Sequence, residues 1–272
     1  METKIIKVTP LSAEAILRKS KVNNRKIKDS HVDFLASQML SGQWIENSGE
    51  PLIFNGDGLI DGQHRMLAVI RSNKSFDFLV VTGASKESFA VIDSGIGRTG
   101  GDILHINNVI DSSKMFTIIK GWLILKNSGT HGIPGSWSKK LATNQIVLKT
   151  YNEDPEYWVQ VCRDCNRWYK SYNRLMNISF FAPIYVAINK KAGDQAYRFF
   201  ELLCNMRFSE NRNDPLRKFT NLMVGNASSL KKYKIGTKRA LLIKTWNAFY
   251  EGKSISALKF ADDNEFPSIL PK

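Results

Sequence analysis

Cysteine, histidine and long hydrophobic runs are scarce in this sequence. Its 272 residues contain three cysteines and four histidines. Three cysteines cannot form a disulfide framework in a chain of this length, which is typical of proteins in a reducing compartment. No segment reaches the ~18 uninterrupted apolar residues of a membrane-spanning helix, and the N-terminus lacks the apolar run of a signal peptide. These absences predict a cytoplasmic protein with no membrane partner.

Length and composition indicate a folded protein of two domains. Hydrophobic residues make up 43% and aromatic residues 11% of the chain, which is enough for a sizeable core. The length exceeds the usual ~100–200 residues of one domain. Residues 1–107 alternate helix-like and strand-like segments, whereas residues 108–272 carry helical periodicity with intervening loops. We therefore expect an α+β protein, with a small mixed α/β domain followed by an all-α domain.

The positive charge is concentrated in the second part of the chain. The formal net charge is +14. Residues 1–110 hold 13 Lys/Arg and 12 Asp/Glu, whereas residues 111–272 hold 26 and 13. Such an asymmetry favours a polyanionic partner for the second part, nucleic acid first, because each neutralised phosphate releases condensed counterions. The alternative interpretation is a charge that only keeps the protein soluble.

Residues 51–83 follow the order hairpin, glycine turn, helix and strand. Two short apolar runs flank Asn55-Gly56-Asp57-Gly58, whose residue types suit a tight hairpin turn. Asp61-Gly62-Gln63-His64-Arg65 then leads directly into a helical run, and residues 76–81 return as a strand. A glycine turn that opens a helix exposes unpaired backbone N–H groups at the positive end of the helix dipole, which favours an anion.

The side chains around this glycine could add chemistry to the turn. His64 and Arg65 would supply two further donors to a bound phosphate, or pack inside the domain. Asp61 could coordinate a metal bound to a nucleotide or act as a general base. Asp61 could equally cap the helix that follows. We retain these alternatives as open predictions.

The stretch Leu59-Ile60-Asp61-Gly62-Gln63-His64-Arg65-Met66-Leu67-Ala68 resembles the ParB/sulfiredoxin superfamily, in its branch with a DGQHR signature. An upstream helix ending near Ser41-Gly42-Gln43-Trp44, a strand over residues 51–54 and a strand over residues 80–81 fall in the order that the family uses. The resemblance spans about residues 4–105. It implies a ParB/sulfiredoxin-like fold and a nucleotide-phosphate site at the turn. It also implies that the protein is located in a bacterial or phage-infected host cell.

The resemblance also implies a ligand and a set of site residues. Partitioning members bind CTP and act as DNA clamps, and sulfiredoxin members use ATP, so we expect ATP or CTP with Mg²⁺. Gln63 stands where sulfiredoxins have their cysteine, and without a thiolate it excludes sulfinic-acid reduction. The expected catalytic residues are Asp61 and His64. The expected nucleotide-binding residues are Asn24, Arg25, Gly62, Gln63, His64, Arg65 and Arg98.

The second part of the chain offers cations interleaved with aromatic residues. Cations follow phosphates and aromatic rings stack on unpaired bases, although Trp168 and Tyr172, four residues apart on a helix, are more typical of a core. Cys162 and Cys165 have a zinc-like spacing without a second ligand pair, so packing is the favoured interpretation. The expected nucleic-acid-binding residues are Arg163, Arg167, Lys170, Lys231, Lys232, Lys234, Lys238 and Arg239.

Three functions remain open from the sequence. The first is a ParB-like DNA-binding protein with a nucleotide site in its first domain and a basic helical second domain. Such a protein could form a homodimer. The second is an enzyme, either a nuclease or an NTP-dependent phosphotransferase, although no cluster of carboxylates typical of a two-metal nuclease lies near the turn. The third is a phage-type protein that binds and blocks a host protein.

Overall fold

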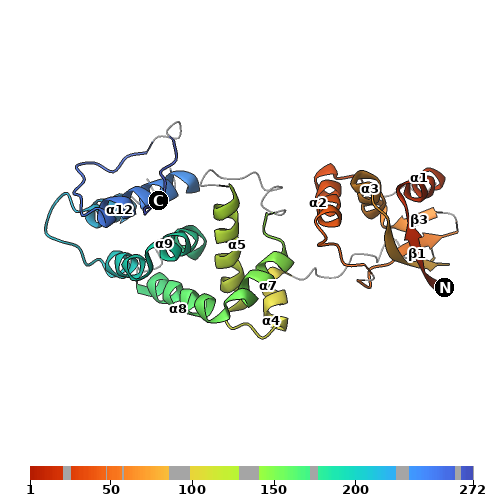
Figure 1. Ribbon diagram of the computed structural model, residues 1–272, viewed down its shortest axis with the longest axis horizontal. Coiled ribbons are helices and arrows are strands. Elements are labelled where there is room, and N and C mark those ends of the chain that lie inside the picture. The colour runs from red at the N-terminus through yellow and green to blue at the C-terminus, as the bar shows by residue number, and fades with distance from the viewer. Residues whose placement is uncertain are drawn as a thin grey trace. The chain divides into compact units, whose positions relative to one another are not determined.

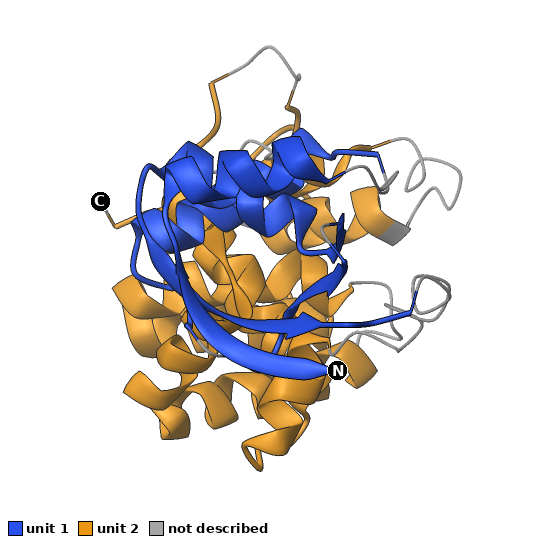
Figure 2. Ribbon diagram, turned by 90° about the vertical axis from the view of Figure 1, so that its right-hand side faces the viewer, with its two compact units in different colours: residues 1–97 blue, residues 98–272 orange. Residues whose placement is uncertain are grey.

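The computed structural model describes residues 1–20, 26–46, 48–56, 58–85, 99–128, 141–171, 177–224, 233–260 and 265–271. These residues form four strands and ten helices (Figure 1), so the predicted α+β composition is confirmed. The chain divides into two compact units, residues 1–97 and residues 98–272, here called unit 1 and unit 2 (Figure 2). Among the described helices, none is long and apolar enough to cross a membrane.

Unit 1 contains one four-stranded mixed sheet in the order β1-β4-β2-β3. Its strands are β1 (Glu2–Val8), β2 (Leu52–Asn55), β3 (Gly58–Asp61) and β4 (Phe76–Thr82). The predicted hairpin is confirmed, because β2 pairs antiparallel with β3. Gly56 has φ +54° in its turn, a conformation that favours glycine. β4 lies between β1 and β2, antiparallel to the first and parallel to the second.

Three helices cover one face of this sheet (Figure 2): α1 (Pro10–Lys19), α2 (Asp29–Leu40) and α3 (Gln63–Ser72). Their apolar sides meet the strands in a core that includes Leu52, Met66 and Val69. Two side-chain contacts show that α2 and α3 run in the same direction. Lys28, before α2, donates to His64 near the start of α3, and Ser72 at the end of α3 contacts Met39 at the end of α2. The N-terminal ends of these two helices therefore lie together.

The regular secondary structure in the described residues of unit 2 is helical. Its helices are α4 (Gly100–Ile106), α5 (Ser112–Ser128), α7 (Asn144–Glu153), α8 (Pro155–Ser171), α9 (Ile178–Cys204), α10 (Pro215–Val224) and α12 (Ile235–Tyr250). The short helix α4 was not expected from the sequence. It packs on α5, and a Cβ added to Gly100 would overlap the ring of Phe116. This contact explains why the units divide at residue 97, ten residues before the expected end of the first domain.

Apolar residues recur at helical spacing over residues 180–191 and 196–206, and both stretches belong to one element, α9. It is kinked at Gly193, where φ is +45° and ψ is −116°. These angles leave the helical region and are readily available only to glycine. The kink therefore lies between the two patterns that the sequence displays.

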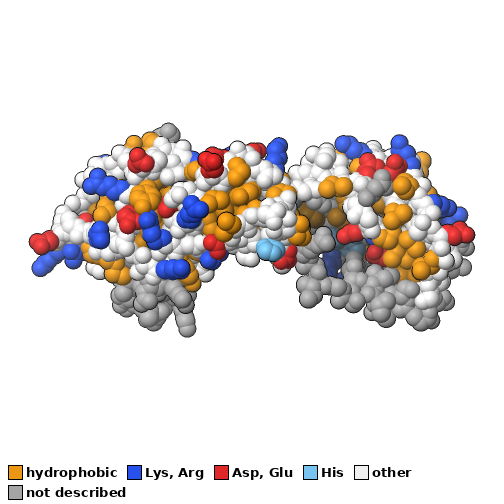
Figure 3. Space-filling model, turned by 90° about the horizontal axis from the view of Figure 1, so that it is seen from below, with side chains coloured by type: hydrophobic (Ala, Val, Ile, Leu, Met, Phe, Trp, Pro, Cys, Tyr) orange, Lys and Arg blue, Asp and Glu red, His pale blue; other side chains and the backbone are white. Residues whose placement is uncertain are grey.

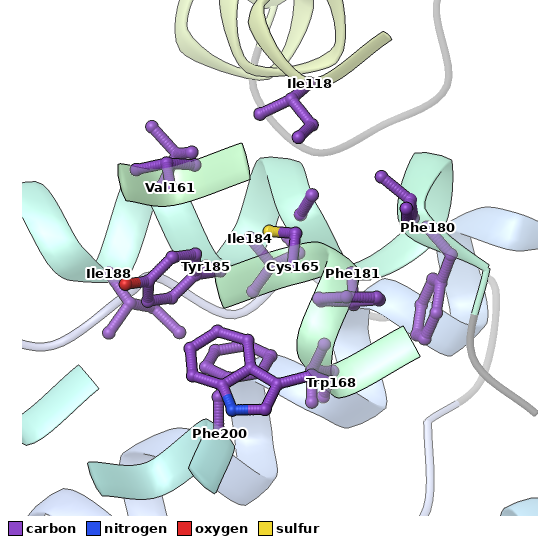
Figure 4. Close-up of a cluster of buried hydrophobic side chains, with 14 of the residues drawn as sticks. Ile118, Val161, Cys165, Trp168, Phe180, Phe181, Ile184, Tyr185, Ile188 and Phe200 are labelled. Carbon is purple, nitrogen blue, oxygen red and sulfur yellow. The ribbon is translucent and has the colours of Figure 1, made fainter. Parts of the chain in front are cut away.

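The core of unit 2 contains Trp168, one of the two aromatic residues that the sequence analysis weighed as a base platform or a packing residue (Figure 4). Trp168 is 0% exposed, and its ring lies 4.8 Å from that of Tyr185 and 5.5 Å from that of Phe200. The packing interpretation is confirmed for Trp168, whereas Tyr172 lies outside the described residues.

The cysteines lie in the same core. Cys162 and Cys165 are both buried, as the packing interpretation predicts. Burial raises the pKa of the Cys162 thiol to about 11, and it raises the pKa of Cys165 well above its usual value. Thiols in this state are poor ligands and nucleophiles, because the thiolate is the reactive form. In the part of the chain that the structure describes, no group of three or more His, Cys, Asp or Glu residues is arranged to hold a metal ion.

Candidate functional site

The turn before α3 has the backbone geometry that the sequence predicts. Gly62 is the N-cap residue with φ +111°, and its carbonyl accepts from the Met66 N–H at 3.0 Å. A Cβ added to Gly62 would overlap the side chain of Leu52, so close packing also requires glycine here. Within the described residues, no side chain caps α3. Its first backbone N–H groups therefore lack the usual side-chain acceptor.

Arg65 and Asp61 pair with each other, and Arg65 lies as the packing alternative predicts. Arg65 is 9% exposed, and its Nη1 donates to the Glu50 carbonyl at 2.6 Å. Its Nη2 donates to the Pro51 carbonyl at 2.9 Å and to Asp61 Oδ2 at 2.8 Å. The guanidinium thus joins the segment before β2 to the end of β3. It is directed at protein acceptors, and Asp61 pairs with it and does not cap α3.

His64 also makes a contact inside unit 1. It is 5% exposed, and its Nε2 accepts from the Lys28 N–H at 3.1 Å. A nitrogen that accepts a hydrogen bond carries no proton, so this arrangement requires the other ring nitrogen to hold the proton. The His31 ring lies 5.3 Å from that of His64. Lys28 and His31 were not singled out from the sequence, because their proximity to the turn depends on how α2 packs against α3.

The arrangement leaves backbone groups, more than side chains, available for a ligand. Lys28 is the N-cap residue of α2, and no side chain among the described residues caps that helix either. Asp29, in its first turn, pairs with Arg71 at 3.2 Å. Two uncapped helix starts thus lie side by side, and Gln63 is the first residue of α3. Gln63 Oε1 is buried and has no hydrogen-bond partner among the described residues. Two adjacent positive dipole ends favour an anion.

Five of the expected binding residues lie outside the described residues. Nothing in the structure therefore bears on them, and they stay predictions. They are Asn24, Arg25 and Arg98 of the nucleotide set and Lys231 and Lys232 of the nucleic-acid set.

On α8 the three expected cations form one exposed stripe. Arg163, Arg167 and Lys170 are spaced i, i+4 and i+7, and all three are exposed. Arg167 donates to the Tyr197 hydroxyl at 2.6 Å and to Glu201 Oε2 at 2.9 Å, so it joins α8 to α9. Arg163 and Lys170 form no ion pair with any residue that the structure describes, which leaves their charges available to a phosphate.

At the start of α12 the expected cations have different environments. Lys234 is the exposed N-cap residue, Lys238 is half-buried, and the first turn contains no acidic residue. Arg239 is also half-buried, and its Nη2 donates to the Ser179 carbonyl at 3.3 Å. Burial lowers the pKa of Arg239. Arg239 thus holds α12 against α9, and the sequence-based assignment to the binding surface does not fit its contacts.

Comparisons of the sequence and structure with family models, curated proteins and solved structures found no match. The resemblance to the ParB/sulfiredoxin superfamily therefore depends on the DGQHR string and on the order of the elements around it.

Proposed function

We propose that this chain binds nucleic acid, DNA first, through unit 2 and holds a nucleotide phosphate at the start of α3, as a ParB/sulfiredoxin-like protein would. The charge of unit 2 carries the proposal. Unit 2 has 27 Lys/Arg against 14 Asp/Glu, whereas unit 1 has 12 against 11. Lys and Arg side chains are spread in separate groups over the visible face of unit 2 (Figure 3). A surface of this kind suits repeated phosphates.

One part of this surface is the basic edge, which we define as Lys170, Lys234 and Lys238. Arg239 links the start of α12 to Ser179, in the first turn of α9. α8 ends at residue 171 and α9 begins at residue 178, so the chain between them can span at most about 25 Å. The start of α12 contacts the first turn of α9, and the end of α8 lies within about 25 Å of that turn. The positive end of the α12 dipole adds to the charge of its two lysines.

The nucleotide part of the proposal depends on backbone donors. The N–H groups at the start of α3 would hold the phosphates, and Lys28 before α2 would lie at the edge of the same site. Mg²⁺ is usually held by substrate phosphates and one or two carboxylates. Asp61 fits this role through Oδ1, since only Oδ2 accepts from Arg65 among the described residues.

The DNA-binding proposal is tested by measuring anisotropy of labelled single- and double-stranded DNA over a range of salt concentrations. Lys234→Ala/Lys238→Ala should lower the affinity and flatten the dependence on salt, by roughly 0.9 in log–log slope for each duplex phosphate that is no longer neutralised. Lys149→Ala/Arg198→Ala removes two exposed cations from α7 and α9 and is the matched control. Equal weakening in both double variants, or no binding at low salt, would contradict the proposal.

The nucleotide site is tested by calorimetric titration with ATP and CTP in the presence of Mg²⁺. Gln63→Glu conserves the shape of the side chain and suits the positive helix end, so the fold should be retained. The same carboxylate would repel a phosphate, and the affinity should fall about tenfold or more. Gln38→Glu, near the end of α2, is the control and should bind as the parent protein does. Unchanged affinity of the Gln63 variant would show that this turn does not hold the phosphates.

A further inference from the structure

A small pocket lies in unit 2 where α8 packs against the kinked part of α9. Its volume is about 200 Å³. α8 contributes one side of a helix at spacing i, i+3, i+4 and i+7, and α9 contributes residues from before and after Gly193. The eight lining residues are Tyr157, Gln160, Val161, Asp164, Tyr185, Asn189, Asp194 and Tyr197.

The carboxylate of Asp164 lies deep in this pocket. Asp164 is 5% exposed, and its oxygens accept from Gln160 Nε2 at 3.0 Å and from the Tyr185 hydroxyl at 3.3 Å. Figure 4 shows the Tyr185 hydroxyl at the border of the apolar cluster. Arg167 approaches to 3.7 Å, but it is shared with Glu201. A carboxylate offers about four acceptor positions, so Asp164 can accept further hydrogen bonds from a ligand.

The Tyr157 hydroxyl is the second unusual group. It is buried and has no hydrogen-bond partner among the described residues. Buried hydroxyls without a partner need an explanation in native proteins. Tyr157 lines the pocket, but its hydroxyl is inaccessible to a water-sized molecule, so it does not serve as a contact for a ligand.

The charge of the pocket is opposite to that of unit 2 as a whole. Its eight lining residues include the carboxylates of Asp164 and Asp194 and no Lys or Arg, in a unit with nearly twice as many basic as acidic residues. Asp164 lies at the bottom and Asp194 is exposed, so one carboxylate is deep and the other lies at the mouth. Negatively charged hydrogen-bond acceptors favour ligands that carry positive charge and N–H donors.

The aromatic rings near the pocket already hold one ammonium group. Lys190 Nζ lies 4.4 Å from the ring centre of Tyr157, 5.0 Å from that of Trp122 and 5.6 Å from that of Trp158. Ring faces attract ammonium groups through their negative quadrupole. The Tyr157 ring face thus already contacts the ammonium group of Lys190.

We infer that this pocket binds a small organic cation with a primary ammonium group, such as an aliphatic amine or diamine. Asp164 would accept from the buried ammonium, and the exposed Asp194 would attract a second cationic group. A nucleotide is excluded by size, since pockets for drug-sized ligands are about 300–1,000 Å³. The inference is independent of DNA binding by unit 2.

The test is calorimetric titration of the full chain, freed of nucleic acid, with 1,4-diaminobutane. We expect saturable binding on the order of 0.1 mM, and none by 1,4-butanediol, which has the same length without charge. Asp164→Asn should weaken binding about tenfold or more, because the ligand no longer meets a charged acceptor. Asp194→Asn removes the exposed carboxylate of the pocket and should weaken binding about three- to fivefold without loss of thermal stability.

Glu156→Gln is the matched control, because it removes one negative charge from α8 outside the pocket. It should bind the diamine as the parent protein does. Three results would each overturn the inference: no binding at about 10 mM diamine, equal binding of the diol, or equal weakening in the Glu156 and Asp164 variants. If Asp164→Asn fails to fold, unchanged affinity in Asp194→Asn would overturn it as well.

Discussion

The two units use their charged side chains differently. Near the candidate phosphate site of unit 1, Arg65 pairs with Asp61, and Arg71 pairs with both Asp29 and Asp33. In unit 2, Arg163 and Lys170 on α8 form no ion pair with any described residue. Unit 1 has nearly equal numbers of basic and acidic residues, whereas unit 2 has about twice as many basic ones. Arg65 is thus an internal link in unit 1, whereas Arg163 and Lys170 belong to the exposed surface of unit 2.

This difference shows what a charged residue in a motif can do. Arg65 and His64 stand in the DGQHR string, and both bind backbone groups of their own unit. Such interactions fix the loop geometry and leave the helix N–H groups to meet a ligand. On α8 no comparable acceptors among the described residues pair with Arg163 and Lys170, so their charge is available to a polyanion.

The largest effect that would test this comparison is the removal of the Arg65 guanidinium. Arg65→Met should destabilise unit 1 by roughly 3–5 kcal/mol, because Asp61 and two backbone carbonyls would be left without a buried partner. Arg71→Met is the matched control, since Arg71 pairs with Asp29 and Asp33 at the surface, where ion pairs contribute about 0–1 kcal/mol.

Scanning calorimetry distinguishes the units if they unfold in separate transitions. The transition of unit 1 should move to much lower temperature in Arg65→Met, and that of unit 2 should stay in place. A small shift equal to that of Arg71→Met would show that Arg65 is not an internal link. The guanidinium would then again be a candidate ligand of the phosphate.

The local features of unit 1 were accessible from sequence, and its long-range contacts were not. Asn55-Gly56 and Gly62 predict turns because few residues adopt positive φ, and the structure has them there. The acceptors of Arg65 lie 14 and 15 residues earlier in the chain, at backbone carbonyls that carry no sequence signal. The local sequence is the same whether Arg65 faces a ligand in the loop or forms a buried link inside the unit.

The pocket of unit 2 escaped sequence analysis for a related reason. Asp164 falls within an amphipathic helical pattern, between Cys162 and Cys165, and no local rule distinguishes a buried carboxylate from an exposed one. Its partner Tyr185 is 21 residues away on another helix. Gly193 was visible as an interruption between two helical patterns, but a kink and a loop interrupt the pattern alike.

An intermediate effect is expected at the kink of α9. Gly193→Ala should destabilise unit 2 by about 1–3 kcal/mol, since φ +45° with ψ −116° is strained for any residue with a Cβ. Gly236→Ala, near the start of α12, provides a control of opposite sign. Its Cβ would meet open space at an ordinary φ, so alanine should stabilise α12 by about 0.5–1 kcal/mol. Urea unfolding of both variants measures the difference, and the same sign in both would show that the kink is not fixed by glycine.

The smallest expected effect is a gain of stability in unit 2. Burial raises the pKa of Asp164, so the folded state binds a proton there more readily than the unfolded state does. The parent protein therefore loses stability as the pH rises above the ordinary aspartate value and through the raised one. Asn carries no charge at any pH, and its amide oxygen keeps an acceptor for one of the two donors, Gln160 or Tyr185. Near neutral pH, Asp164→Asn should unfold at a higher temperature, because its free energy of unfolding should rise by about 0.5–1 kcal/mol. This gain should shrink in acid. Thermal unfolding at about pH 4 and about pH 7.5 measures this trend. A decrease of stability at neutral pH would mean that the pairing of Asp164 with Arg167 outweighs its burial, and the carboxylate would then be a structural link like Arg65 in unit 1.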